Sequence, residues 1–360
     1  MNVHPNDLGA GVHIMHILEN HLGSAQFVDN KLLEAEIRHL NQFILAGNAA
    51  AINSGNPVAY QADIDARTAN FSQMIGKIIL ASGLVTGTLI PIPTAGGYQW
   101  AVLTCGHIME CIDKIDNPAE EATFELSGKV PIPITSIRLF KRNGRESQMS
   151  YNGGMNFSPL NMAELGALAR SLPRYDGDGD VAICYLGNIN VGGAIINTQA
   201  YLNHCYPIAG FAFNPAANQI NFTMGASAIN FHFVNHLAEA QAISAMINGL
   251  AKNQNFVIGY AGFNPLSQTL SVARDGNLPL FPGFISVPVT TEYSFFHDAP
   301  TYSGMSGGPI FHFAPAAPGA AGALNTINVY GVVQGYNFGN VGAACTPSRC
   351  VGSFLQLNVL

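Results

Sequence analysis

The chain has 360 residues, of which 48% are hydrophobic and only 10% are charged, and its net charge at neutral pH is −7. This length allows one large or two medium domains with a substantial core. The 15 basic residues are spread thinly, so the composition excludes an electrostatic site for nucleic acid or for anionic lipid. The 38 glycines and 20 prolines predict many turns, as all-β barrels have.

The first 17 residues lack the basic and apolar regions of a signal peptide, so we expect none there. No uninterrupted apolar run approaches the roughly 20 residues that a membrane helix needs. We therefore expect no membrane span.

Residues 1–75 are predicted to form a helical extension. Apolar residues recur at three- and four-residue steps between Phe27 and Ile44, which is typical of an amphipathic helix. A second helix is predicted over about 63–74. Such an extension is a cap, a propeptide or a surface that binds a partner, and packing against the rest of the chain is the favoured interpretation.

From Lys77 the pattern changes to short apolar runs separated by glycine and proline, which predicts strands at 78–80, 85–90 and 98–104. The run A-V-L-T-C-G-H at 101–107 ends in a small-residue turn and His107. A capping box at 161–164 predicts a short helix over about 162–172. The run G-D-V-A-I-C at 179–184 then places Asp180 directly before another apolar strand.

Further short strands are predicted across 188–230 and at 256–260, 270–273 and 329–336. Between them, apolar residues share one stripe across 235–252 and predict a helix there. We expect three parts: the extension at 1–75, a first β domain at 76–195 with His107 and Asp180, and a second at 196–360 with the helical insertion.

The stretch T-Y-S-G-M-S-G-G-P at 301–309 places Ser306 in a tight turn flanked by glycines. The backbone N–H groups of Gly304 and Ser306 can point at one oxygen and stabilise the negative charge that develops in acyl transfer. A serine hydroxyl alone is a poor nucleophile, so it needs a base and an orienting acid. His107 and Asp180 are the candidates.

These three motifs occur in the order His107, Asp180, Ser306, and in that order they resemble the motifs of the chymotrypsin-like serine proteases. The serine motif is most similar to that of bacterial glutamyl endopeptidases, and the resemblance covers roughly residues 76–360. It implies a mainly β fold of two six-stranded antiparallel β-barrels, here with the helical extension and helical insertions. It also implies a secreted or exported enzyme that hydrolyses a protein or peptide substrate through an acyl-enzyme, without a cofactor.

The same resemblance implies a substrate-binding wall on the strand after the serine. Pro300 stands where trypsin-like members have an acid, so a preference for basic side chains is not expected. Thr301 matches a threonine of the glutamyl endopeptidases, but Val333 stands where they have a histidine, and an apolar or small pocket fits at least as well. The expected substrate-binding residues are Pro300, Thr301, Val333, Gln334, Gly335 and Tyr336.

One other interpretation of the serine motif is excluded by the residues that follow it, and two more can be separated by experiment. The nucleophile elbow of an α/β-hydrolase needs an acid after the serine, and no Asp or Glu follows Ser306. A catalytically silent binding module with retained motifs stays open, and so does an esterase that uses the same three residues.

We expect no metal site. The D-x-D-x-D run at 176–180 is half of a calcium loop, but position 12 of such a loop is Gly187, so a turn that delivers Asp180 fits better. Asp178 is the alternative acid. His232 and His236 are four residues apart, without a clear carboxylate partner. The six cysteines do not have zinc spacing, and free thiols are slightly favoured over disulfides.

Overall fold

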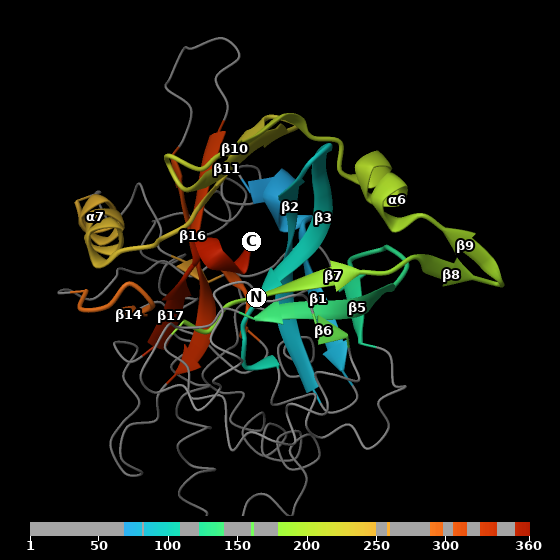
Figure 1. The fold of residues 1–360 in the computed structure, drawn as a ribbon, viewed down its shortest axis with the longest axis horizontal. Helices are drawn as coiled ribbons and strands as arrows, with labels where there is room; N and C mark the ends of the chain where they lie inside the picture. Colours follow the sequence, from blue (N-terminus) through green and yellow to red (C-terminus); the bar gives the residue numbers. More distant parts are fainter. Residues whose placement is uncertain are drawn as a thin grey trace, which may run out of the picture.

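A computed structural model describes residues 68–80, 83–108, 122–139, 160–161, 179–249, 258–259, 289–297, 305–314, 325–336 and 350–360. These residues are mainly β, as expected, and form two large sheets that lie side by side (Figure 1). The predicted helices at 27–44 and 162–172 and the predicted strand at 270–273 lie outside the described residues.

The first sheet is antiparallel throughout and follows the order β4-β1-β2-β3-β7-β5-β6. An additional pairing of β4 with β5 closes six of its strands into a barrel. The predicted first barrel is therefore confirmed. Its strands are β1 (Ile75–Leu80), β2 (Gly83–Thr94), β3 (Gly97–Thr104), β4 (Thr123–Leu126), β5 (Ile132–Leu139), β6 (Leu160–Asn161) and β7 (Ala182–Leu186).

Strand β3 is buried on both faces from Trp100 to Thr104, so it does not show the alternation of a strand with one wet face. One face of β3 packs against the second sheet, where the Trp100 ring meets Phe222 edge-on with ring centroids 6.4 Å apart. The strand that leads to His107 is therefore fixed from two sides.

The second sheet follows the order β10-β11-β12-β16-β15-β13, with β17 paired to both β16 and β14. It departs from the expected antiparallel barrel, because β12 and β16 run parallel. Among the described residues no pairing closes this sheet, so a second barrel stays a prediction. Its strands are β10 (Ala209–Asn214), β11 (Gln219–Met224), β12 (Ser227–His232), β13 (Ile258–Gly259), β14 (Ser294–His297), β15 (Pro309–Ala314), β16 (Asn325–Tyr336) and β17 (Cys350–Phe354).

Helix α7 (Leu237–Asn248) confirms the helical insertion predicted at 235–252. Glu239 fixes its start by accepting hydrogen bonds from the backbone of Asn235 and His236, at 2.7 and 3.2 Å. Within the described residues, no helix combines the length and the apolar character needed to cross a membrane.

Helix α6 (Thr198–Cys205) was not expected, because only strands were predicted across 188–230. The side chain of Asn197 caps it by accepting a hydrogen bond from the N–H of Ala200 at 2.9 Å. The helix follows a separate hairpin of β8 (Ile189–Val191) and β9 (Ala194–Ile196), and a single turn of 3-10 helix, η2 (Leu357–Val359), ends the chain.

One hydrophobic cluster contains residues of both sheets. Residues 68–75 are the described part of the N-terminal extension and are helical over 68–72, where Phe71 is fully buried against Phe311 of β15, with ring centroids 5.0 Å apart. Asn70 also donates a hydrogen bond to Ser227 at 3.4 Å. The expected packing of the extension against the β domains is thus confirmed for this short segment.

Candidate active site

His107 lies in a turn that begins where β3 ends. The Thr104 hydroxyl donates to the carbonyl oxygen of Thr86 at 2.8 Å and ties the end of β3 to the neighbouring β2. Gly106 and His107 then form the turn. The backbone N–H of His107 donates to Asp180 Oδ1 at 2.6 Å, so the acid fixes the turn as well as the side chain.

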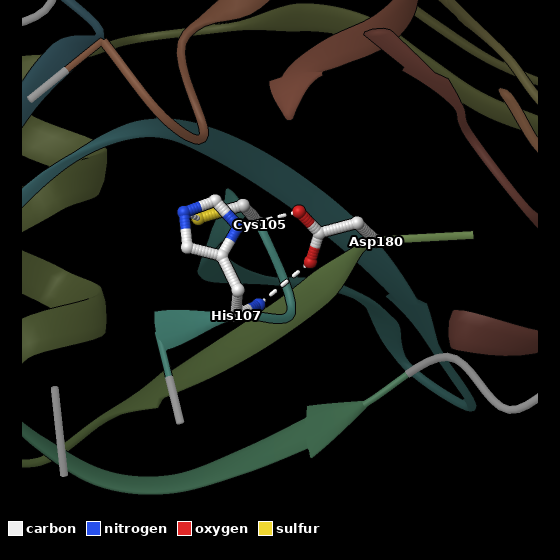
Figure 2. A group of neighbouring side chains, drawn as sticks. All are labelled: Cys105, His107 and Asp180. Carbon is white, nitrogen blue, oxygen red and sulfur yellow. Dashed lines mark hydrogen bonds and ion pairs between the residues drawn. The ribbon is translucent and has the colours of Figure 1, made fainter. Parts of the chain in front are cut away.

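The register of the first barrel places Asp180 beside this turn. Thr104 of β3 is opposite Ala182 of β7 in an antiparallel pair. Continuing that register by two residues puts Asp180 opposite Gly106. The other Asp180 oxygen, Oδ2, lies 2.5 Å from His107 Nδ1, so the carboxylate uses both oxygens on one residue (Figure 2).

These contacts and the burial of the pair determine the pKa of His107. Asp180 is 1% exposed, whereas the His107 side chain is 22% exposed. Burial opposes protonation of His107, but the Asp180 charge, Cys105 and their hydrogen bonds outweigh it and hold its pKa well above the ordinary value of 6.5. In neutral His107, an Nδ1–H bonded to the carboxylate leaves the Nε2 lone pair as the base.

Cys105 is a second neighbour of the imidazole that the motifs did not suggest. Its fully buried sulfur lies 3.6 Å from His107 Nε2, and Figure 2 shows the sulfur behind the ring. Cys105, Cys184 and Cys205 are free thiols, as was favoured, and burial raises the pKa of Cys184. Cys111, Cys345 and the side chain of Cys350 lie outside what the structure describes.

Donor atoms of Cys105, His107 and Asp180 all lie within 4.8 Å of one another, a grouping that metal ions also use. Two features favour an orienting role for the acid instead. Both Asp180 oxygens already accept hydrogen bonds from His107, and the thiol is fully buried. His232 and His236, the other pair considered for a metal, lie on β12 and at the start of α7, respectively.

The Ser306 turn is seated directly against the histidine turn. The carbonyl oxygen of Ser306 accepts a hydrogen bond from the N–H of Thr86 at 2.8 Å. Gly307 has φ of +81°, and a Cβ there would overlap the Thr104 hydroxyl and the Thr86 carbonyl and lie 2.9 Å from the Cys105 nitrogen. Close backbone contact therefore joins the two turns, although they belong to different sheets.

The same turn is bonded to β16. Gly307 donates to the carbonyl oxygen of Val333, and Val333 donates to that of Gly308, both at 2.8 Å. Val333 is fully buried and uses both backbone groups in this way. Of the other expected substrate-binding residues, Gly335 and Tyr336 pair with β17.

Pro300, Thr301 and Gly304 lie outside the described residues, as does the alternative acid Asp178.

A contact from β17 to the acid was missed by sequence reasoning. Ser353 is fully buried, and its Oγ accepts a hydrogen bond from the backbone N–H of Asp180 at 3.1 Å. The same hydroxyl donates to Gln334 Oε1 at 3.1 Å. Its stretch, C-V-G-S-F, carries no motif, because a lone serine in an apolar strand has many structural roles.

No protein-family model matches the sequence, and no curated protein matches it significantly. Among solved structures, the chain is similar to a Glu endopeptidase in complex with MPD, at 11% identity and a TM-score of 0.36, covering 79% of this chain and 86% of that chain. It is also similar to the inactive form of Rv3671c protease, at 17% identity and a TM-score of 0.31, covering 80% and 86%. Likenesses this weak identify no functional residue of this chain.

Proposed function

We propose that this chain is a serine endopeptidase that hydrolyses peptide bonds through His107, Asp180 and Ser306. The observation that supports it most is the partly exposed imidazole held by the buried Asp180 carboxylate, in a turn against which the Ser306 turn is packed. A hydroxyl, an imidazole and a carboxylate are the groups that acyl transfer by serine requires.

In the proposed mechanism, Asp180 fixes the tautomer and orientation of His107 and stabilises its protonated form. His107 Nε2 takes the proton of Ser306 as the hydroxyl attacks the scissile carbonyl, and then gives it to the leaving amine. Water hydrolyses the acyl-enzyme by the same route. No cofactor takes part.

The backbone N–H groups of Gly304 and Ser306 are proposed to hold the oxyanion. The two residues after Ser306, Gly307 and Gly308, each share a backbone hydrogen bond with Val333 of β16. These bonds hold the Ser306 turn against β16. Donors that are held in place before the reaction stabilise developing charge without the cost of reorganising.

The substrate backbone is proposed to pair with β16 next to this turn. Among the described residues, β15 pairs with β16 as far as Val332, and β17 pairs along the other edge as far as Tyr336. We propose residues 334–336 as the wall along which an extended peptide adds as a strand. Pro300 and Thr301 stay candidates for the pocket that holds the substrate side chain.

The test is Ser306→Ala, compared with Ser72→Ala in the N-terminal segment. We expect Ser306→Ala to lose at least about 10³-fold in kcat/KM on a peptide library, with unchanged circular dichroism, because the nucleophile is gone. Ser72→Ala should keep full activity. Retained peptidase activity in Ser306→Ala would refute the proposal.

Two further measurements separate the alternatives. Fluorophosphonate labelling at Ser306 shows an activated serine and excludes a silent binding module, for which no labelling is expected. Comparing peptide and simple ester substrates separates an endopeptidase from an esterase, because the two share the acyl-enzyme but differ in the leaving group.

A further inference from the structure

The acid of the candidate site is held from the second sheet as well as from its own. Within the first barrel, Asp180 lies just before β7 and gives its two oxygens to His107. Its backbone N–H points the other way and donates to Ser353 Oγ on β17. The Asp180 side chain is therefore bonded to His107, whereas its main chain is anchored to the second sheet.

The Ser353 hydroxyl uses both of its hydrogen-bonding functions. It accepts from Asp180 and donates to Gln334 Oε1 on β16, and the residue is 0% exposed, so water cannot replace either partner. Gln334 directly follows Val333, whose carbonyl oxygen accepts the Gly307 N–H. One connection therefore runs from Asp180 through Ser353 and Gln334 to Gly307, the residue that follows Ser306.

We propose that Ser353 is a positioning residue that holds the Asp180 carboxylate in register with His107 while tying it to the strand that supports the Ser306 turn. Ser353 touches neither substrate nor reacting atoms and acts through Asp180. Without its hydroxyl, the Asp180 N–H becomes a buried donor without an acceptor, and the segment before β7 shifts to satisfy it. This role rests on the proposed function, since it matters for turnover only if Asp180 orients the base.

The test compares Ser353→Ala with Ser244→Ala, because the buried Ser244 hydroxyl on α7 has no hydrogen-bond partner in the described part of the chain. We expect Ser353→Ala to lose roughly ten- to a hundredfold in kcat with little change in KM, and Ser353→Thr, which keeps a hydroxyl, to recover most of it. Ser244→Ala should match the wild type.

A second readout does not depend on turnover. The His107 pKa is measured by proton NMR in an otherwise unchanged Ser306→Ala background. We expect Ser353→Ala to lower it toward 6.5, because a displaced carboxylate stabilises the protonated imidazole less. If Ser306→Ala keeps its activity, the endopeptidase proposal fails, and this NMR titration still decides the role of Ser353.

A folded Ser353→Ala protein with wild-type kcat and a wild-type His107 titration would overturn the inference. Should Ser353→Ala fail to fold, Gln334→Met removes the acceptor of the Ser353 hydroxyl and keeps Ser353 itself. A lowered His107 pKa in that variant supports the inference, and an unchanged pKa overturns it.

Discussion

At the scale of single residues, the His107–Asp180 pair determines how activity depends on pH. In the proposed mechanism only neutral His107 takes the Ser306 proton, and the pKa of His107 lies well above 6.5. We predict that kcat/KM rises with pH to a midpoint above 6.5 in the free enzyme. Asp180→Asn should lower that midpoint and reduce kcat roughly 10³- to 10⁴-fold. A midpoint at or below 6.5 in the wild type would contradict the pairing.

The pKa of His312 on β15 is shifted in the opposite direction from that of His107, and this shift makes stability depend on pH. His312 is 6% exposed, and burial, with a smaller effect of nearby His232, lowers its pKa from 6.5 to about 4. The unfolded chain binds the proton more tightly, so stability is complete above pH 6.5 and is lost as pH falls toward 4. The loss is at most about 3 kcal/mol.

We predict that His312→Gln weakens the fall in unfolding free energy between pH 6.5 and 4, measured by urea denaturation. His204→Gln, at an exposed position on α6, is the matched control and should keep the wild-type slope. An identical slope in all three proteins would show that His312 is not the group that titrates. Some slope should remain in His312→Gln, because burial also lowers the pKa of His232.

At the scale of elements, the packing of the Ser306 turn against β2 and the end of β3 depends on Gly307. Alanine there meets two obstacles, the positive φ and the overlap with Thr104 and Thr86. Gly193 in the β8–β9 hairpin is a matched control, with φ of +86° and nothing within 4 Å of a Cβ. We predict that Gly193→Ala costs about 1–2 kcal/mol of stability, the backbone penalty alone.

Gly307→Ala should cost a further 1–3 kcal/mol, roughly the effect of overpacking, and should also reduce turnover because the turn moves away from His107. Denaturant midpoints and kcat of the two variants provide the comparison. Equal stability losses, with turnover unchanged in both variants, would show that the two turns are not packed together.

The positions of residues at strand ends could be predicted from the sequence, because an apolar run that stops at a small-residue turn marks where the strand ends. This logic located His107 and Asp180, and β3 and β7 confirm it. Long-range pairing carries no such local signal, so the parallel contact of β12 with β16 departs from expectation. Ser353 was missed for the same reason, since its partner Asp180 is 173 residues away along the chain.

At the scale of the whole molecule, the candidate site lies where the two sheets share one core. The cluster that includes Trp100 in the first barrel also includes Phe222 and Phe311 in the second sheet. Hydrogen bonds cross the same boundary at Thr86 and Ser353. A site divided between two sheets keeps its geometry only if they unfold as one cooperative unit.

Phe71 tests this cooperativity, because it is fully buried against Phe311 and belongs to the shared cluster. We predict that Phe71→Ala costs about 3–5 kcal/mol of unfolding free energy, whereas Phe296→Ala, at a site 52% exposed, changes it by less than about 0.5 kcal/mol. Trp100 is the single tryptophan, so its fluorescence reports on β3 and on the contact of β3 with Phe222 of the second sheet. In urea, the fluorescence and circular dichroism midpoints of Phe71→Ala should shift together. A fluorescence transition that stays at the wild-type midpoint while circular dichroism shifts would show that the sheets unfold independently.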